Sequence, residues 1–210
     1  MLHKTKAIIL RTVPYGDTSL VVTAYTELFG LQSYMVKGAR RVSKKGAGQS
    51  QFFQPAALLD LVVYYNELKQ LQIINEIKWS VLYRQVLSNV IKNSVALHMV
   101  ELLVKSINQT ETCEELFAFA ESNLLLLDEC EAGVTANLPL HFSLHLAAQL
   151  GFRIEDNYSE SRKILDLQEG RFVSEATVHQ LYLDEKLSEI TFRLLQVNSP
   201  VTLYRIKLNK

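Results

Sequence analysis

Apolar and polar residues alternate in five short segments of the first 80 residues, which is the pattern of strands with one buried face. Turn-forming residues separate several of them, with Pro14 and Gly16 after the first segment, Gly30 after the second and Asn66 after the fourth. Five strands in this length predict a small closed barrel, and the strand count fits both an OB-fold and an SH3-like barrel. The predicted strands cover residues 2–13, 18–28, 31–36, 55–65 and 71–77.

Beyond Trp79 the apolar residues recur every three or four positions, which predicts helices. The first helix is predicted over residues 81–108, where Asn93 interrupts one apolar stripe. Further helices are predicted over 112–130 and 137–150, so this part of the chain should build a helical core of its own. The stripe of the first helix consists of Val86, Val90, Asn93, Leu97, Val100, Val104 and Ile107.

The last part of the chain is less regular. Apolar residues on either side of Glu169 and Gly170 predict a β-hairpin near residues 164–173. Helices are predicted over 174–184 and 187–196. The fold class is therefore α+β with two domains, a small barrel followed by a mainly α-helical domain.

Composition narrows the class of protein. The chain has 210 residues, of which 48% are hydrophobic, enough for a sizeable core. Its longest apolar runs, such as residues 61–65 and 124–127, are far too short to cross a bilayer, so we expect a cytoplasmic protein. Cys113 and Cys130 lie on one predicted helix, about 25 Å apart at 1.5 Å per residue, and we expect free thiols.

The net charge of zero conceals an asymmetry. Residues 1–79 contain 10 Lys or Arg against 5 Asp or Glu, whereas residues 80–210 contain 12 against 17. Small polar residues at positions 46–50 follow a basic stretch, which predicts a loop suited to a polyanion. A solvated loop that only keeps the protein soluble is the alternative. The cations of the stretch are Lys37, Arg40, Arg41, Lys44 and Lys45.

Further residues of the barrel could contact a nucleic acid. Lys4, Lys6 and Arg11 add positive charge on the first strand, and Tyr34 lies just before the basic stretch. Cations bind phosphates and exposed aromatic rings stack on bases when a barrel holds a single strand. We therefore predict Tyr34 as a stacking residue. An RNA-binding OB protein is the competing hypothesis, and it predicts a preference for RNA through the 2′-hydroxyl.

Enzyme chemistry has little support. His141 and His145 have the four-residue spacing of two zinc ligands on a helix, but Phe142 stands where a zinc hydrolase has glutamate, and no third ligand is spaced to join them. Ser143 lacks the flanking glycines of a nucleophile elbow. A metal-dependent hydrolase is the less favoured alternative, and we expect no catalytic residues, no metal and no cofactor.

Ordered motifs in the first 80 residues resemble the N-terminal domain of the RecO recombination-mediator family. The match includes Ile9-Leu10-Arg11, Tyr15-Gly16-Asp17-Thr18-Ser19, Thr26, Gly30, Lys37-Gly38-Ala39-Arg40-Arg41, Ser43 and Gln54-Pro55. Leu150-Gly151-Phe152 and the hairpin of Gly170 and Phe172 resemble later landmarks of that family. The resemblance implies a five-stranded OB-fold over residues 1–79 and a helical domain over residues 80–210.

The resemblance also implies a non-enzymatic DNA repair and recombination mediator. Such a protein binds single- and double-stranded DNA, anneals complementary strands, works at the nucleoid during repair and helps to load RecA on DNA coated with the single-stranded-DNA-binding protein SSB. The implied protein partners are RecR, the C-terminal tail of SSB and, indirectly, RecA. We expect Arg84, Arg153 and Arg162 to be candidate partner-binding residues in the acidic helical half.

This chain departs from the family pattern in two places. Many members carry a four-cysteine zinc site after the Leu-Gly-Phe landmark, whereas residues 153–173 contain no cysteine here. Ordinary packing is expected to replace the metal. Members also tend to continue beyond the equivalent of Lys210 into a final helix, so we expect this chain to be short at its C-terminus.

Overall fold

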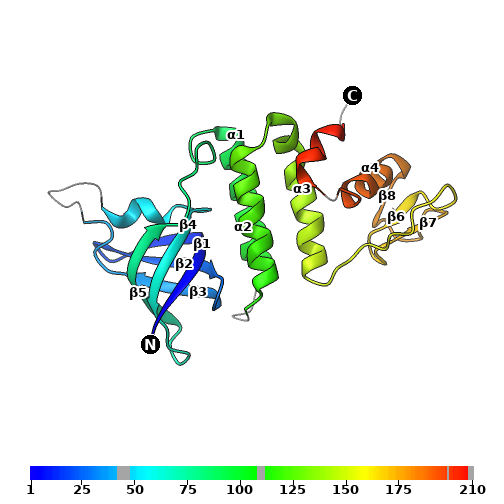
Figure 1. Cartoon of the computed structure of the whole chain (residues 1–210). Coiled ribbons are helices and arrows are strands. Elements are labelled where there is room, and N and C mark those ends of the chain that lie inside the picture. The colour runs from blue at the N-terminus through cyan, green and yellow to red at the C-terminus, as the bar shows by residue number, and fades with distance from the viewer. Residues whose placement is uncertain (42–47, 108–111, 198, 208–210) are drawn as a thin grey trace. The chain divides into compact units, whose positions relative to one another are not determined.

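The computed structural model describes residues 1–41, 48–107, 112–197 and 199–207 (Figure 1). These residues group into two compact units, Met1–Glu129 and Cys130–Lys210. The first unit contains the strands predicted for the barrel together with two helices, because those helices pack on the barrel. Compact packing thus divides the chain later than the change in sequence period at residue 79.

The first unit contains a closed five-stranded barrel (Figure 1). Its strand order is β1-β2-β3-β5-β4, and β4 pairs with β1 to close it. All pairs are antiparallel except β3 with β5, which is parallel. This order is that of the OB-fold, so the five-strand prediction is confirmed and the SH3-like alternative is not. The strands are β1 Leu2–Tyr15, β2 Ser19–Thr26, β3 Gly30–Val36, β4 Leu58–Tyr64 and β5 Leu71–Trp79.

Alternation within the strands fills the barrel. Ile9, Val22, Tyr34, Leu59 and Val63 point inward and are fully buried. The short 3-10 helix η1, Gln49–Phe53, contributes its last residue to the same core. The side chains of alternate positions face outward, where Ile8 and Tyr25 are buried and others, such as Lys4 and Ile73, are exposed.

Helix α1, Val90–Ser106, begins nine residues later than predicted. The preceding connector is not helical because its backbone N–H groups have another partner. Those of Arg84, Gln85 and Val86 donate to the Asp128 carboxylate at 2.8, 2.8 and 2.9 Å. The side chain of Asn89 then caps α1.

The apolar stripe predicted for the first helix is only partly right: Val86, Val100 and Ile107 are buried, but Val90, Leu97 and Val104 are exposed. Val95, Met99 and Leu103 face the core as well. Two stripes with the same helical spacing run along this helix, and spacing alone does not distinguish them. Packing against α2, Glu114–Glu129, and β1 selects the buried one.

In the second unit, α3, Ala132–Gln149, begins five residues before the predicted start at Asn137 and contains Pro139 in its interior. Asn137 is not at the helix start. Its buried side-chain amide donates to the carbonyl oxygens of Leu203 and Ile206, both at 2.7 Å. This clamp holds the 3-10 helix η2, Pro200–Arg205, against α3.

The predicted hairpin is confirmed as β6, Ile164–Asp166, and β7, Arg171–Val173. The helix predicted over 174–184 is wrong, because β8, Tyr182–Leu183, pairs with β6 to form a three-stranded sheet. Helix α4, Glu185–Leu195, follows with Asp184 as its N-cap. Within the described part of the chain, no helix is long and apolar enough to span a membrane.

Candidate nucleic-acid interface

The described part of the basic stretch, residues 37–41, is held in place by two neighbouring segments of the chain. After β3 the chain passes through Lys37 to Gly38, whose φ of +70° lies in the left-handed region. The Arg40 backbone N–H donates to the Thr18 carbonyl at 2.9 Å, and its guanidinium donates to the carbonyl oxygen of Gly16 in the β1–β2 turn. This backbone is therefore tied to the β1–β2 turn.

The second segment is residues 48–50, where the chain enters η1. We call residues 37–41 and 48–50 together the loop base. The Ser50 backbone N–H donates to the Ala39 carbonyl at 3.0 Å, and Ala39 is fully buried. A Cβ atom at Gly48 would lie 2.8 Å from the Ala39 oxygen and 2.9 Å from the Arg41 oxygen. Only glycine permits this close approach without a shift. The two ends of the basic loop are thus held together on the barrel.

Beside this base lies a hollow of about 360 Å³, the turn hollow. Lys37 and Arg41 are exposed at its edge, and Tyr15 is 59% exposed. The cations can contact phosphates, the hydroxyl groups can donate hydrogen bonds, and the Tyr15 ring can stack on a base. The turn hollow is lined by Tyr15, Thr18, Ser19, Met35, Lys37, Gly38 and Arg41.

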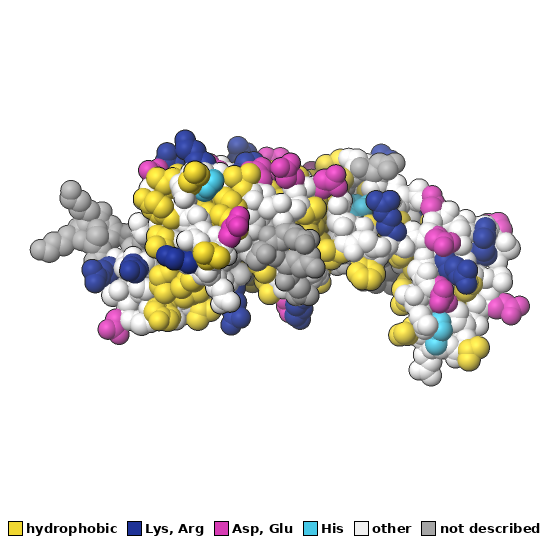
Figure 2. Space-filling view, turned by 90° about the horizontal axis from the view of Figure 1, so that it is seen from below, with side chains coloured by type: hydrophobic (Ala, Val, Ile, Leu, Met, Phe, Trp, Pro, Cys, Tyr) yellow, Lys and Arg dark blue, Asp and Glu magenta, His cyan; other side chains and the backbone are white. Residues whose placement is uncertain are grey.

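The structure thus brings two of the predicted loop cations, Lys37 and Arg41, into one hollow, with Arg40 exposed beside them. Lys44 and Lys45 lie outside the described residues. Arg11 is exposed on β1 next to the register shift with β2. Figure 2 shows one side of the molecule, on which exposed apolar side chains of the first unit gather with Lys and Arg side chains around them.

The prediction that Tyr34 stacks on a base is wrong. Its side chain is 0% exposed and belongs to the barrel core, because β3 buries Gln32, Tyr34 and Val36 rather than the alternate residues. Burial raises the pKa of its phenol well above the usual value. The ring that is exposed beside the cations is Tyr15, which precedes the turn Gly16-Asp17. Its position next to a turn is the signal that could have identified it.

Lys6 is paired rather than free. Its ammonium group donates to a carboxylate oxygen of Glu121 on α2 at 2.9 Å. This hydrogen bond, together with nearby carboxylates, raises the pKa of Lys6 despite the opposing effect of partial burial. A cation held by a carboxylate offers a phosphate less net attraction, so Lys6 is a weaker DNA-binding candidate than Lys37.

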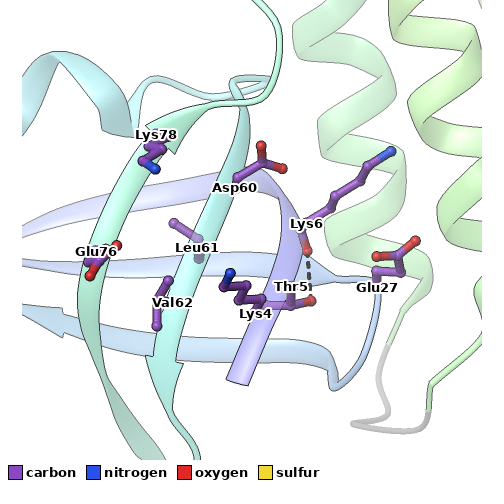
Figure 3. A pocket seen from close by; sticks show the side chains of 9 residues that line it. All are labelled: Lys4, Thr5, Lys6, Glu27, Asp60, Leu61, Val62, Glu76 and Lys78. Atoms are coloured by element: carbon purple, nitrogen blue, oxygen red, sulfur yellow. Dashed lines mark hydrogen bonds between the residues drawn. The ribbon is translucent and has the colours of Figure 1, made fainter. Parts of the chain in front are cut away.

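Lys4 and Lys6 line a different hollow, of about 390 Å³, on the outer face of β1, β4 and β5 (Figure 3). Across these strands Lys6 pairs in register with Asp60, and Asp60 with Lys78. Acids and cations are balanced here, which suits a polyanion poorly. The charged residues that line it are Lys4, Lys6, Lys78, Glu27, Asp60 and Glu76.

The three predicted partner-binding arginines occupy separate places. Arg84 is exposed in the connector before α1, in the first unit. In the second unit, Arg162 closes a tight turn with Ser159, whereas Arg153 lines a hollow of about 700 Å³. That hollow has apolar walls that include Phe152 and Phe192.

His141 and His145 lie side by side on α3 with ring centroids 4.1 Å apart. Burial, together with the neighbouring His145, lowers the pKa of His141 to about 4, so the ring is neutral at pH 7. Within the described ranges, no cluster of three or more His, Cys, Asp or Glu side chains could hold a metal ion.

Two family models match most of the chain. The model described as "Recombination protein O N terminal" matches residues 1–83, which contain the barrel. The model described as "Recombination protein O C terminal" matches residues 87–162. The two matches meet near the change from strands to helices that the sequence predicts.

Relatives named "DNA repair protein RecO" cover nearly the whole chain. The protein of Azobacteroides pseudotrichonymphae genomovar. CFP2 is 30% identical over 198 residues, 94% of this chain and 81% of the relative. That of Flavobacterium psychrophilum is 30% identical over 197 residues, 91% and 81% of the two chains. That of Bacteroides fragilis is 30% identical over 199 residues, 94% and 81%. With its OB-fold barrel and both family matches, this chain belongs to the RecO family of DNA repair proteins.

Proposed function

We propose that this protein is a non-enzymatic mediator that binds single- and double-stranded DNA with the base of its basic loop and anneals complementary strands. The observation that carries the proposal is the turn hollow, where Lys37, Arg41 and the exposed Tyr15 ring lie together on a fixed backbone. Arg40 adds a third exposed cation, and Lys44 and Lys45 extend the same basic stretch. Annealing follows from charge, because cations that neutralise phosphates reduce the repulsion between two strands.

Protein partners complete the proposal. We propose RecR and the SSB tail as direct partners and RecA loading on SSB-coated DNA as the outcome, as for a recombination mediator. The apolar hollow beside Arg153 is the proposed site for the SSB tail, since a cation next to apolar walls suits an acidic peptide with apolar residues. Asp156 and Glu169 also line it and outnumber Arg153, so contacts with the apolar walls must supply most of the attraction. Arg84 and Arg162 are proposed to contribute at the rim of partner surfaces.

The test of DNA binding uses the double variant Lys37→Ala/Arg41→Ala. Both side chains are exposed, so the fold should remain. Each phosphate contact on a single strand contributes about −0.7 to the slope of log affinity against log salt, so the variant should flatten the slope by about 1.4. The matched control is Lys105→Ala/Lys186→Ala, which removes the same charge from helices α1 and α4. Equal slopes for wild type and the Lys37→Ala/Arg41→Ala variant would reject the assignment.

Two further assays address specificity and outcome. Matched DNA and RNA oligonucleotides separate the proposal from an RNA-binding OB protein, which would prefer RNA through the 2′-hydroxyl. Annealing of complementary strands coated with SSB tests the mediator role. The Lys37→Ala/Arg41→Ala variant should anneal more slowly than its control, whereas equal rates would separate annealing from the turn hollow.

A further inference from the structure

Another hollow of the barrel, of about 730 Å³, lies along the seam between β3 and β5. These strands pair over only three positions, Ser33–Met35 with Leu71–Ile73. Beyond this pairing the strands lose their hydrogen-bonded register, and the space is lined by residues of β3, β5 and η1. We call it the seam hollow.

The walls of the seam hollow are apolar and partly open to solvent. Met35, Phe52, Ile73 and Ile77 line it, and Ile73 is 50% exposed. Ile73 and Leu71 lie on an outer face of the barrel, where a polar residue would satisfy the fold equally well. Apolar side chains gathered at one accessible hollow indicate a binding surface.

The seam hollow and the turn hollow share Met35 and Lys37. Lys78 provides a second cation at the seam, and Glu76 is the acid that lines it. The apolar walls therefore lie next to two cations, of which Lys37 is also one of the proposed phosphate contacts. The Lys4 hollow shares Lys78 and Glu76 with the seam hollow, but Lys4, Lys6, Glu27 and Asp60 also line it, so three acids balance three lysines there, whereas the seam hollow has two lysines against one acid.

We propose that the seam hollow holds the unstacked bases of a single strand whose phosphates lie on Lys37 and Lys78. The inference rests on the proposed DNA binding and assigns the base contacts of that site. Bases are flat and apolar on their faces, so they gain from burial against Ile73 and Phe52, while the adjacent cations hold the backbone. In a duplex the bases are stacked and paired, so they cannot enter, and the hollow favours single strands. A protein partner would also bury apolar walls, but the two lysines against one acid, with Lys37 common to the turn hollow, favour nucleic acid.

The test compares an oligothymidylate of about 15 nucleotides with an abasic strand of the same length, because both carry the same phosphates. Wild type should bind the oligothymidylate about tenfold more tightly. Ile73→Thr, which keeps the β-branched shape, should lower this ratio, and stacking on Tyr15 accounts for the part that remains. The control Leu2→Thr, at the exposed start of β1, should retain the full ratio. Lys37→Ala should weaken binding of both strands.

Trp79 gives a second readout. It is the single tryptophan of the chain, and its ring centroid lies 5.0 Å from that of Phe52. Bases in the seam hollow should change its fluorescence, whereas the abasic strand should not. The same signal in the free Ile73→Thr variant checks that the barrel is folded.

The outcomes separate the two proposals. Equal affinity of wild type for both strands, or an unchanged ratio in Ile73→Thr, overturns the base-binding inference and leaves DNA binding intact. Loss of a protein partner by Ile73→Thr with an unchanged ratio assigns the hollow to that partner and also overturns it. If the wild type binds neither strand, the proposed DNA binding itself is refuted.

Discussion

Asp128 provides the sharpest test of how the first unit is held together. Its carboxylate is only 6% exposed and accepts three backbone N–H groups from the connector between β5 and α1. The Lys92 ammonium donates to the Asp128 backbone carbonyl at 2.8 Å. Replacement by Asn keeps the shape of the side chain but turns one acceptor into a donor that faces a backbone N–H.

The magnitude follows from these contacts. Asp128→Asn loses at least one hydrogen bond to a charged acceptor and leaves a buried N–H without a partner, and each effect costs about 1–3 kcal/mol. Because some relaxation of the connector is expected, we predict a loss of about 2–4 kcal/mol in the free energy of unfolding. Asp60→Asn, at an exposed position of β4, should change it by less than about 0.5 kcal/mol.

The pH dependence gives an independent check. Burial alone would raise the pKa of Asp128, but the three backbone N–H groups and Lys92 outweigh it and lower the pKa below the ordinary 3.8. A lowered pKa means that the ionised carboxylate stabilises the fold above the unfolded pKa, and that this stability is lost as pH falls through the folded pKa. The difference between wild type and Asp128→Asn should therefore be full at pH 7 and shrink below about pH 4.

Urea unfolding followed by Trp79 fluorescence measures both effects, since the tryptophan lies in the same unit. The unfolding midpoint should shift with an unchanged m-value. If Asp128→Asn unfolds within about 0.5 kcal/mol of wild type at pH 7, the reasoning about the connector is refuted.

Three further predictions concern the barrel surface. Gly48→Ala should weaken DNA binding in a filter or anisotropy assay by distorting the loop base, because its Cβ would lie 2.8 Å from the Ala39 oxygen; unchanged affinity would contradict this contact. Tyr15→Ala should lower the affinity for single strands by about 1 kcal/mol, whereas Tyr34→Phe, inside the barrel, should leave it unchanged. A loss of affinity in Tyr34→Phe but not in Tyr15→Ala would restore Tyr34 as the stacking residue. The ion pair of Lys6 should show a coupling of only about 0.2–1 kcal/mol in a double-mutant cycle of unfolding, because its side chain is 43% exposed, and a larger value would indicate a desolvated pair.

Sequence periodicity predicted the strands of the barrel well. Alternation is set within each strand, and residues such as Gly16 and Gly30 mark turns by their own conformational preference, with φ of +56° and +60°. The same pattern did not decide which face of β3 is buried. Both of its alternating sets contain apolar residues, so the inward position of Tyr34 depends on its pairing with β2 and β5.

Some residues of the candidate site could also be identified from the sequence, and others could not. The basic stretch from Lys37 is evident from the sequence because its cations are neighbours in the chain. The role of Tyr15 and the seam hollow around Ile73 is not, because their partners come from other strands. Likewise, nothing near Lys6 in the sequence indicates that its ammonium group forms an ion pair with Glu121.

The sequence by itself determined the elements formed by neighbouring residues: five strands, most helices, the hairpin at β6 and β7, the basic stretch and the family resemblance. Tertiary structure decided the closure of β1 on β4, the start of α1 and the inward face of Tyr34. The physical reason is the range of the interactions. Turn and strand preferences act within a few residues, whereas the Asp128 carboxylate reaches backbone groups 42 to 44 positions earlier, and no local pattern records that contact.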